Sequence, residues 1–218
     1  MSNSVFLSAE PSNGIRTVEP AVVIGPVRMY GVDCFPVSPE IVSVGKMGEY
    51  APWFMEIGLR AMRDIVNEWV EKIIGKNVVV DTSLAGDGSM VSLLVNDAPA
   101  GAYGNPGLWQ VIPVLVAGLM AKPGSVLKLE HPDAFLSEVG QAELGNFLAN
   151  VASTGVMVVV ETYSMCLMNS FRIAQKNGLI NFTVCMRTDN ALVPVDLGEE
   201  WPEDFFDTQE KQLAILMG

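Results

Sequence analysis

The stretch Val126–Asp133, with the sequence Val-Leu-Lys-Leu-Glu-His-Pro-Asp, decides the fold prediction. It reads as a short buried strand that ends at the carboxylate of Glu130, after which Pro132 turns the chain out of the sheet. A second carboxylate, Asp133, follows three residues later. Many nucleotide hydrolases place a metal-binding carboxylate in this way at the carboxyl edge of a parallel sheet. An ordinary strand–helix turn with surface acids has the same short pattern, so the interpretation depends on the flanking sequence.

Two strand–helix units follow each other from this stretch. Strands are expected at 126–130 and 156–160, and helices over Glu138–Ser153 and Met165–Lys176. Ser137 and Ser164 stand where N-cap residues are preferred. Right-handed crossovers would place both strands in one sheet, with Glu130 and Glu161 at the same edge. The run Val156–Val160 is apolar on both faces, which is typical of a parallel strand covered by helices on both sides.

The rest of the chain predicts an α/β domain over residues 18–218, with a partly parallel sheet flanked by helices and a C-terminal β-hairpin. Residues 1–17, rich in Ser, Asn, Gly and Pro, read as a tail or arm. The other expected elements are a strand at Val18–Ile24, a loop at Val32–Tyr50, one helix from Pro52 to Ile74, a hairpin of Val78–Asp81 and Met90–Val95, a loop at Ala98–Gly107, a buried helix at Leu108–Ala121 with Pro113 in its first turns, strands at Ile180–Arg187 and Leu192–Leu197, and a short helix from Thr208.

Composition limits the class of protein. Half of the 218 residues are hydrophobic and the formal net charge is −12, with a pI near 4.4. A nucleic-acid-binding surface needs clustered lysine and arginine. The basic residues Arg60, Arg63, Lys72 and Lys76 share their predicted helix with four acids, which predicts a solvated face of mixed charge. The sequence therefore argues against nucleic acid and against an anionic membrane as partners.

The few cysteine and histidine residues exclude further classes of site. Cys34, Cys166 and Cys185 are scattered, so we expect reduced thiols and a cytoplasmic protein, or a particle assembled in the cytoplasm. No leader pattern is present at the N-terminus, and the longest apolar run is too short to cross a bilayer. His131 is the single histidine, so zinc sites built on several histidines are excluded.

Six motifs in order carry a resemblance to a known family. They are Ile24-Gly-Pro-Val-Arg28, Val44-Gly-Lys-Met-Gly-Glu49, Gly107-Leu-Trp-Gln-Val-Ile-Pro113, Leu129-Glu-His-Pro-Asp133, Val160-Glu-Thr-Tyr-Ser164 and Trp201-Pro-Glu-Asp-Phe-Phe-Asp207. In this order and spacing, over roughly residues 20 to 218, the chain resembles the carboxyl-terminal half of ABC-type, SMC/RecF/OLD-like ATPases of the AAA family that carry an uncharacterised C-terminal domain. The resemblance implies an ATPase-like α/β fold, with Glu130 as the Walker B carboxylate that would bind the metal.

The departures from the family pattern fall on the groups that handle the triphosphate. The sequence contains no Gly-x-x-x-x-Gly-Lys-Ser/Thr phosphate-binding loop. Trp109, followed by Gln110, stands at the serine of the signature. His131 stands where a water-orienting carboxylate often follows the metal ligand, and Tyr163 stands at the switch histidine. Among these positions Glu130 alone keeps its residue type.

These departures predict a non-catalytic pseudo-ATPase that needs no cofactor and acts as a structural, assembly or scaffold component. Its partners would be proteins, in a homo-oligomer or a larger assembly. The acidic tail supplies the contact candidates Trp201, Phe205 and Phe206, which could pin the tail to the core or dock on a neighbour. A phage or mobile-element origin would fit this role, but the sequence does not show it.

Two other functions stay open. The chain could be one half of a split ATPase, with a separate subunit supplying the phosphate-binding loop. It could instead be a metal-dependent hydrolase that uses Glu130, His131, Asp133 and Glu161 at the sheet edge. ATPase activity only in a mixture with a P-loop protein would favour the split ATPase, and metal soaking that leaves no ion at Glu130 would count against the hydrolase.

Overall fold

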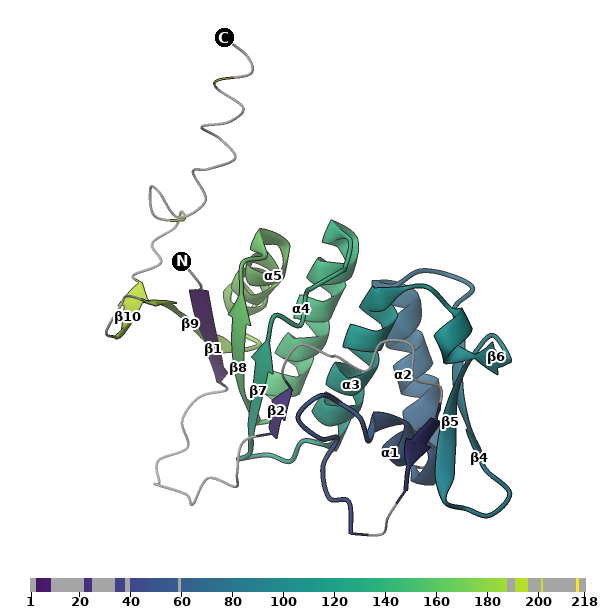
Figure 1. Cartoon of the computed structure of the whole chain (residues 1–218). Helices are drawn as coiled ribbons and strands as arrows, with labels where there is room; N and C mark the ends of the chain where they lie inside the picture. Colours follow the sequence, from purple (N-terminus) through teal and green to yellow (C-terminus); the bar gives the residue numbers. More distant parts are fainter. Residues whose placement is uncertain are drawn as a thin grey trace.

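The computed structural model describes residues 3–8, 22–24, 34–37, 40–58, 60–187, 191–195, 201 and 215. Within them the chain forms two sheets with a layer of helices packed against them (Figure 1). This is the α/β class that the sequence predicts, with a partly parallel sheet and an antiparallel C-terminal strand pair.

The larger sheet has six strands in the order β10-β9-β1-β8-β7-β2. Their bounds are β1 Asn3–Ser8, β2 Val22–Ile24, β7 Val126–Glu130, β8 Met157–Thr162, β9 Asn181–Arg187 and β10 Leu192–Val195. Strands β2, β7 and β8 are parallel. Strand β1 is antiparallel to both β8 and β9, and β9 pairs with β10 in an antiparallel hairpin. The sheet is therefore mixed, with its parallel part formed by β2, β7 and β8.

Strand β1 corrects the prediction for the N-terminus. Residues 1–17 were expected to be a tail or arm, but Asn3–Ser8 forms an interior strand between β8 and β9. Residues 9–17 lie outside the described residues. The available strand signal in Asn-Ser-Val-Phe-Leu-Ser is only the three-residue apolar run Val-Phe-Leu, and the neighbouring Ser, Gly and Pro residues obscure it.

Three helices pack on one face of the six-stranded sheet, α3 (Pro106–Met120), α4 (Glu138–Ser153) and α5 (Met165–Lys176) (Figure 1). Burial alternates along the parallel strands, because Leu127 and Leu129 are buried whereas Lys128 is exposed. The expectation that helices cover both faces is wrong for the described helices. Antiparallel neighbours such as β1 and β9 allow a sheet to bury a single face in this way.

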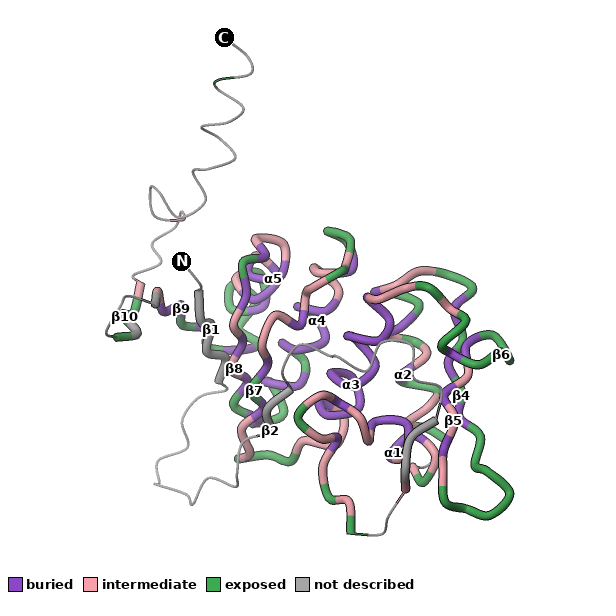
Figure 2. Tube along the Cα trace, in the orientation of Figure 1, coloured by how far each residue is buried: buried purple, intermediate pink, exposed green. Residues whose placement is uncertain are grey.

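Figure 2 shows that burial is greatest along α3, α4 and the strands they cover. The predicted bounds of β7, α4 and α5 are confirmed, and both predicted N-caps are present. The hydroxyl of Ser137 accepts from the N–H of Gly140 at 3.2 Å, and that of Ser164 accepts from the N–H of Leu167 at 3.0 Å. The strand–helix units that carry the candidate site are therefore well marked in the sequence.

The smaller sheet consists of β3 (Cys34–Pro36), β5 (Met90–Val95) and β4 (Val80–Leu84), with β6 (Ala98–Pro99) also paired to β5. The predicted hairpin is thus confirmed, although its first strand is Val80–Leu84 and not Val78–Asp81. Strand β3 lies in a segment predicted as a loop, and β6 and the 3-10 helix η1 (Ala100–Ala102) lie in another. Helices α1 (Ala51–Ile57) and α2 (Arg60–Ile73) pack between this sheet and the other helices.

Two details of the predicted helices are wrong. The single helix from Pro52 to Ile74 is interrupted at Gly58, whose N–H bonds to the carbonyl of Phe54 at the end of α1. Glycine is a poor helix former, so the helix breaks at this position. The apolar periodicity of the sequence continues across the break and therefore does not reveal it. Helix α3 begins at Pro106, so Pro113 lies in its interior, not in its first turns. The predicted helix from Thr208 lies outside the described residues, apart from Ile215.

Cys166 and Cys185 are free thiols, and burial raises the pKa of Cys185. Among the described residues, none of the helices combines the length and apolar character that a membrane crossing requires.

Gly140 in the first turn of α4 gives a test of how the helices fix the site. A Cβ at this position would lie 2.5 Å from the carbonyl oxygen of Ile73 at the end of α2. We expect Gly140→Ala to lower the free energy of unfolding by about 1–3 kcal/mol, because the backbones must separate. Urea denaturation measures it. Gly86→Ala is the control, because nothing lies within 4 Å of the added methyl group; an equal loss there would contradict the packing argument.

Candidate functional site

Glu130 and Glu161 meet at the carboxyl edge of the parallel strands. They are register partners at the ends of β7 and β8. The N–H of His131 donates to the carbonyl of Glu161 at 2.8 Å, which extends the strand pairing by one residue. The ammonium group of Lys128 lies 3.7 Å from the carboxylate of Glu130. The structure therefore brings the two predicted acids to one edge, in the arrangement expected from the sequence.

The turn after β7 is held in an unusual backbone conformation. His131 has φ 48° and Phe135 has φ 64°, although neither residue is glycine. The turn is closed by the N–H of Ala134 donating to His131 and by the N–H of Leu136 donating to Asp133. Such left-handed residues persist where their surroundings fix them. The turn is therefore determined by its contacts and not by the preferences of its residues.

Helix α3 supplies part of that support. Gln110, which is buried, donates from its amide to the carbonyl of His131 at 3.3 Å. Gly107 lies so close to the turn that a Cβ there would be 2.8 Å from the carbonyl oxygen of Phe135. Asn105 caps the helix by accepting from the N–H of Gly107 at 2.9 Å. The beginning of α3 and the turn after β7 thus form one packed unit.

A chain of hydrogen bonds joins this turn to the end of β8. The hydroxyl of Thr162 donates to the carboxylate of Asp133 at 2.6 Å and accepts from the N–H of Ser164 at 2.9 Å. The hydroxyl of Ser164 donates to the amide oxygen of Gln141 at 2.6 Å, and the Gln141 amide donates to the carbonyl of Leu136. These side chains connect the β7–α4 turn, helix α4 and the start of α5.

The positions at which the sequence departs from the ATPase pattern have different environments. Trp109 is only 5% exposed and belongs to the hydrophobic core. Tyr163 is 57% exposed, and its ring stacks on that of His131 with centroids 5.2 Å apart and an interplanar angle of 10°. The structure therefore brings His131 and Tyr163 together, and it places Trp109 inside the molecule.

Metal binding at this edge has little support among the described side chains. Within the residues that the structure describes, no three His, Cys, Asp or Glu side chains form a group that could hold an ion. Asp133 is engaged with Thr162, and Glu130 lies beside Lys128. Glu130 could still contribute one carboxylate to a metal held mainly by phosphate oxygens, which is how Mg²⁺ is commonly bound.

The tail candidates are only partly within the described residues. The indole N–H of Trp201 donates to the side chain of Asn169 at 2.9 Å, and the guanidinium of Arg172 lies 5.1 Å from the Trp201 ring centroid. Trp201 thus packs on α5. Phe205 and Phe206 lie outside the described residues.

Sequence reasoning missed Thr162, Ser164 and Gln141 as a network. Thr162 and Ser164 flank Tyr163 in the motif at the end of β8, and the spacing Thr-x-Ser before a helix is the available signal. Gln141 lies 23 residues away from its partner Ser164. No local pattern announces such a contact.

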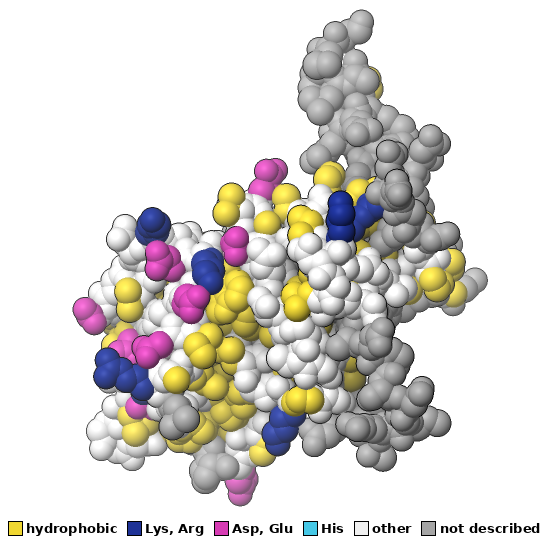
Figure 3. Space-filling model, turned by 180° about the vertical axis from the view of Figure 1, so that it is seen from behind, with side chains coloured by type: hydrophobic (Ala, Val, Ile, Leu, Met, Phe, Trp, Pro, Cys, Tyr) yellow, Lys and Arg dark blue, Asp and Glu magenta, His cyan; other side chains and the backbone are white. Residues whose placement is uncertain are grey.

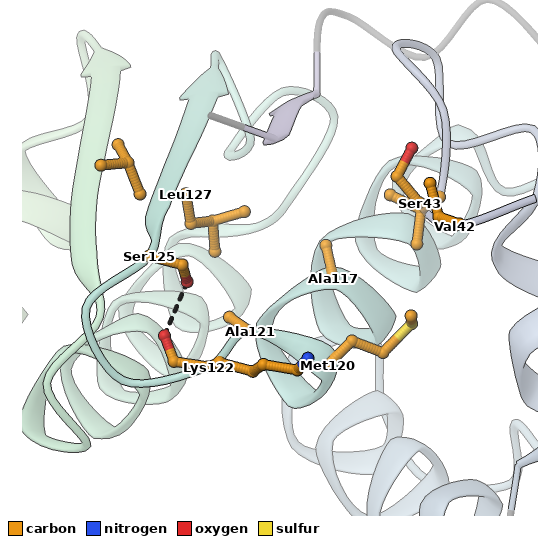
Figure 4. Close-up of a pocket in the computed structure, with 10 residues that line it drawn as sticks. Val42, Ser43, Ala117, Met120, Ala121, Lys122, Ser125 and Leu127 are labelled. Carbon is orange, nitrogen blue, oxygen red and sulfur yellow. Dashed lines mark hydrogen bonds between the residues drawn. The ribbon is translucent and has the colours of Figure 1, made fainter. Parts of the chain in front are cut away.

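A pocket of about 260 Å³ lies away from this edge, where the chain enters β7 (Figure 4). Its walls come from the loop at Val42 and Ser43, from the end of α3 at Ala117 and Met120, and from Ser125 before the strand. The Ser125 hydroxyl donates to the carbonyl of Lys122 at 2.7 Å. Among the described residues that line this pocket, Lys122 is the one titratable residue. The described lining therefore offers space for an apolar group and contains no pair of titratable side chains.

The charged surface at the α2 end of the molecule is mixed. Seen from behind, lysine and arginine side chains alternate there with acids (Figure 3). Arg63 pairs with Asp81 at 2.9 Å, and Lys72 pairs with Glu68 at 2.8 Å. A nucleic-acid surface would need unpaired clusters of basic residues, so this face does not fit that role.

Comparisons with known proteins leave the family open. No protein-family model and no curated protein sequence matches the chain. A solved structure from work on the ATP-driven dimerization and DNA-stimulated activation of SMC ATPases is similar with a TM-score of 0.46 and 13% identity, covering 77% of this chain and 98% of that chain. A likeness at this level carries no argument about the family or the function of this chain.

Thr162 provides a direct test of the network. Thr162→Val keeps the shape of the side chain but removes the hydroxyl, so Asp133 loses its donor and the buried N–H of Ser164 loses its acceptor. We expect the free energy of unfolding to fall by about 1–3 kcal/mol in urea denaturation.

The matched control for this substitution is Thr183→Val, at an exposed position on β9, which should change stability by less than about 0.5 kcal/mol. A loss at Thr162 no larger than at Thr183 would contradict a structural role for the network.

Proposed function

We propose that this chain is a non-catalytic relative of ABC-type ATPases, a pseudo-ATPase that serves as a structural or assembly component through protein contacts. The proposal rests on the resemblance in six motifs together with the state of the carboxyl edge. The observation that carries it is the stack of His131 on Tyr163. These two residues stand where the resemblance expects a water-orienting carboxylate and a γ-phosphate-sensing histidine.

The chemistry of phosphoryl transfer explains why His131 and Tyr163 at these positions support the proposal that the site is inactive. Phosphoryl transfer depends almost wholly on positioning the phosphate and neutralising its charge. Neither residue of this pair is a carboxylate that could orient water, and a tyrosine stands in place of the histidine that the resemblance expects to reach the phosphate. Trp109, at the signature position, is buried in the core and has no hydroxyl. All three positions belong to this chain, so a phosphate-binding loop on another subunit would not change them.

The split-ATPase alternative is weakened by the same residues. A partner subunit could supply a phosphate-binding loop, but it could not replace groups that this half has lost. The metal-dependent hydrolase alternative needs Glu130, His131, Asp133 and Glu161 to converge, and the ring of His131 faces Tyr163 while Asp133 accepts from Thr162. The internal contacts therefore favour the non-catalytic proposal over both alternatives.

Turnover of MgATP by the purified chain tests the proposal. We expect phosphate release no faster than in buffer, and the same result for Glu130→Gln, whereas typical enzymes turn over about 1–1000 times per second. Turnover that requires Mg²⁺ and is abolished by Glu130→Gln would contradict the proposal. Activity that arises only after mixing with a subunit containing a phosphate-binding loop would support the split ATPase instead.

A further inference from the structure

The exposed aromatic side chains are concentrated at one place. Among the large hydrophobic residues that are exposed in the described part of the chain, two are aromatic, Phe135 at 72% and Tyr163 at 57%. Phe135 follows β7 and Tyr163 follows β8, so both lie at the carboxyl edge of the parallel strands. Val139, at 69% exposure, lies in the first turn of α4, directly after the turn that carries Phe135. Exposed aromatic residues of this kind are enriched at protein interfaces.

The backbone holds Phe135 in its exposed position against its own preference. A bulky residue with a φ of 64° is disfavoured, because the left-handed region crowds its Cβ. The carbonyl of Phe135 packs on Gly107, and Leu136 accepts from Gln141, so the turn is fixed on both sides. Strain retained at an exposed apolar side chain points to a use for that side chain.

The surroundings of these aromatic residues are acidic. The two connections, residues 130–138 and 161–164, contain four carboxylates and no lysine or arginine, although Lys128 of β7 lies 3.7 Å from the carboxylate of Glu130. The carboxylates belong to Glu130, Asp133, Glu138 and Glu161. The stacked rings of His131 and Tyr163 lie among them. A partner that fits this surface must therefore bring positive charge and a group that packs on aromatic faces.

We infer that this edge, which we define by Phe135, Val139 and Tyr163, binds an arginine-bearing segment of a partner protein. Arginine combines the required charge with a planar guanidinium group that stacks on aromatic rings. The chain already uses this chemistry internally, because the guanidinium of Arg172 lies over the Trp201 ring with 5.1 Å to the ring centroid. This inference names the kind of partner for the proposed assembly role and rests on that proposal.

A second copy of the chain is a poorer occupant. Each copy carries a net charge of −12, and an edge-to-edge contact would oppose carboxylates with carboxylates. Like charges across an interface disfavour association.

Binding of a designed peptide tests the inference on the full chain. The probe is a fluorescein-labelled peptide of twelve residues with three arginines among serine and leucine, measured by fluorescence anisotropy. We expect Phe135→Ala combined with Tyr163→Ala to weaken binding by about fivefold or more, because each exposed cation–π contact contributes modestly. Tyr163→Phe should bind like the wild type, since the ring face is kept. A peptide with lysine in place of arginine should bind more weakly.

The control is Ile173→Ala, which removes an apolar side chain of 60% exposure from α5, away from this edge, and should leave binding unchanged. Equal binding by the wild type and the double variant would overturn the inference, since it would indicate diffuse attraction to an acidic protein. Sedimentation that shows a dimer dissociated by Phe135→Ala would also overturn it in favour of a second copy. Turnover of MgATP is measured separately, so failure here leaves the proposed function standing.

Discussion

The hydroxyl of Thr162 links two turns that are far apart in the sequence. It donates to Asp133 in the turn after β7 and accepts from the N–H of Ser164 before α5. Thr162 is fully buried, so both bonds form away from water, where losing one partner is costly. The parallel pairing of β7 with β8 brings these turns together, and the Thr162 bonds fix their conformation.

The same constraint explains the chemical character of the carboxyl edge. In an α/β sheet this edge is where ligands usually bind, because strand ends and helix N-termini converge there. Here the polar side chains form hydrogen bonds with the protein's own backbone and side chains. They belong to Asp133, Ser164, Gln141 and Gln110. His131 and Tyr163 add an aromatic stack. Polar groups at this edge therefore serve the fold, and what remains exposed is apolar, aromatic and acidic, which suits a protein partner.

The sequence predicts the strand–helix units accurately because their signals are local. Strand β7, the N-cap serines and the bounds of α4 and α5 all follow from residues within a few positions of one another. The pairing of Glu130 with Glu161 also follows, because right-handed crossovers leave few arrangements. Strand β1 could not be foreseen in the same way, since its pairing with β8 and β9 joins residues more than 150 positions apart.

The site was predicted by position but not by role. Glu130, His131 and Asp133 were placed at the edge from the order of acid and proline, yet nothing local indicates that Asp133 would accept from Thr162 or that His131 would stack on Tyr163. One-sided burial of the sheet was missed for a related reason. Val156–Val160 is apolar throughout, and only the antiparallel neighbours decide that one face is covered.

In this account the polar groups of the carboxyl edge stabilise the fold and do not bind a nucleoside triphosphate. Urea denaturation of the full chain with and without MgATP tests it most directly, because a ligand that binds the folded state alone raises the free energy of unfolding by an amount set by its affinity. The account predicts the same unfolding curve at any MgATP concentration up to about 1 mM. A stabilisation that rises with MgATP concentration and is lost in Glu130→Gln would contradict it.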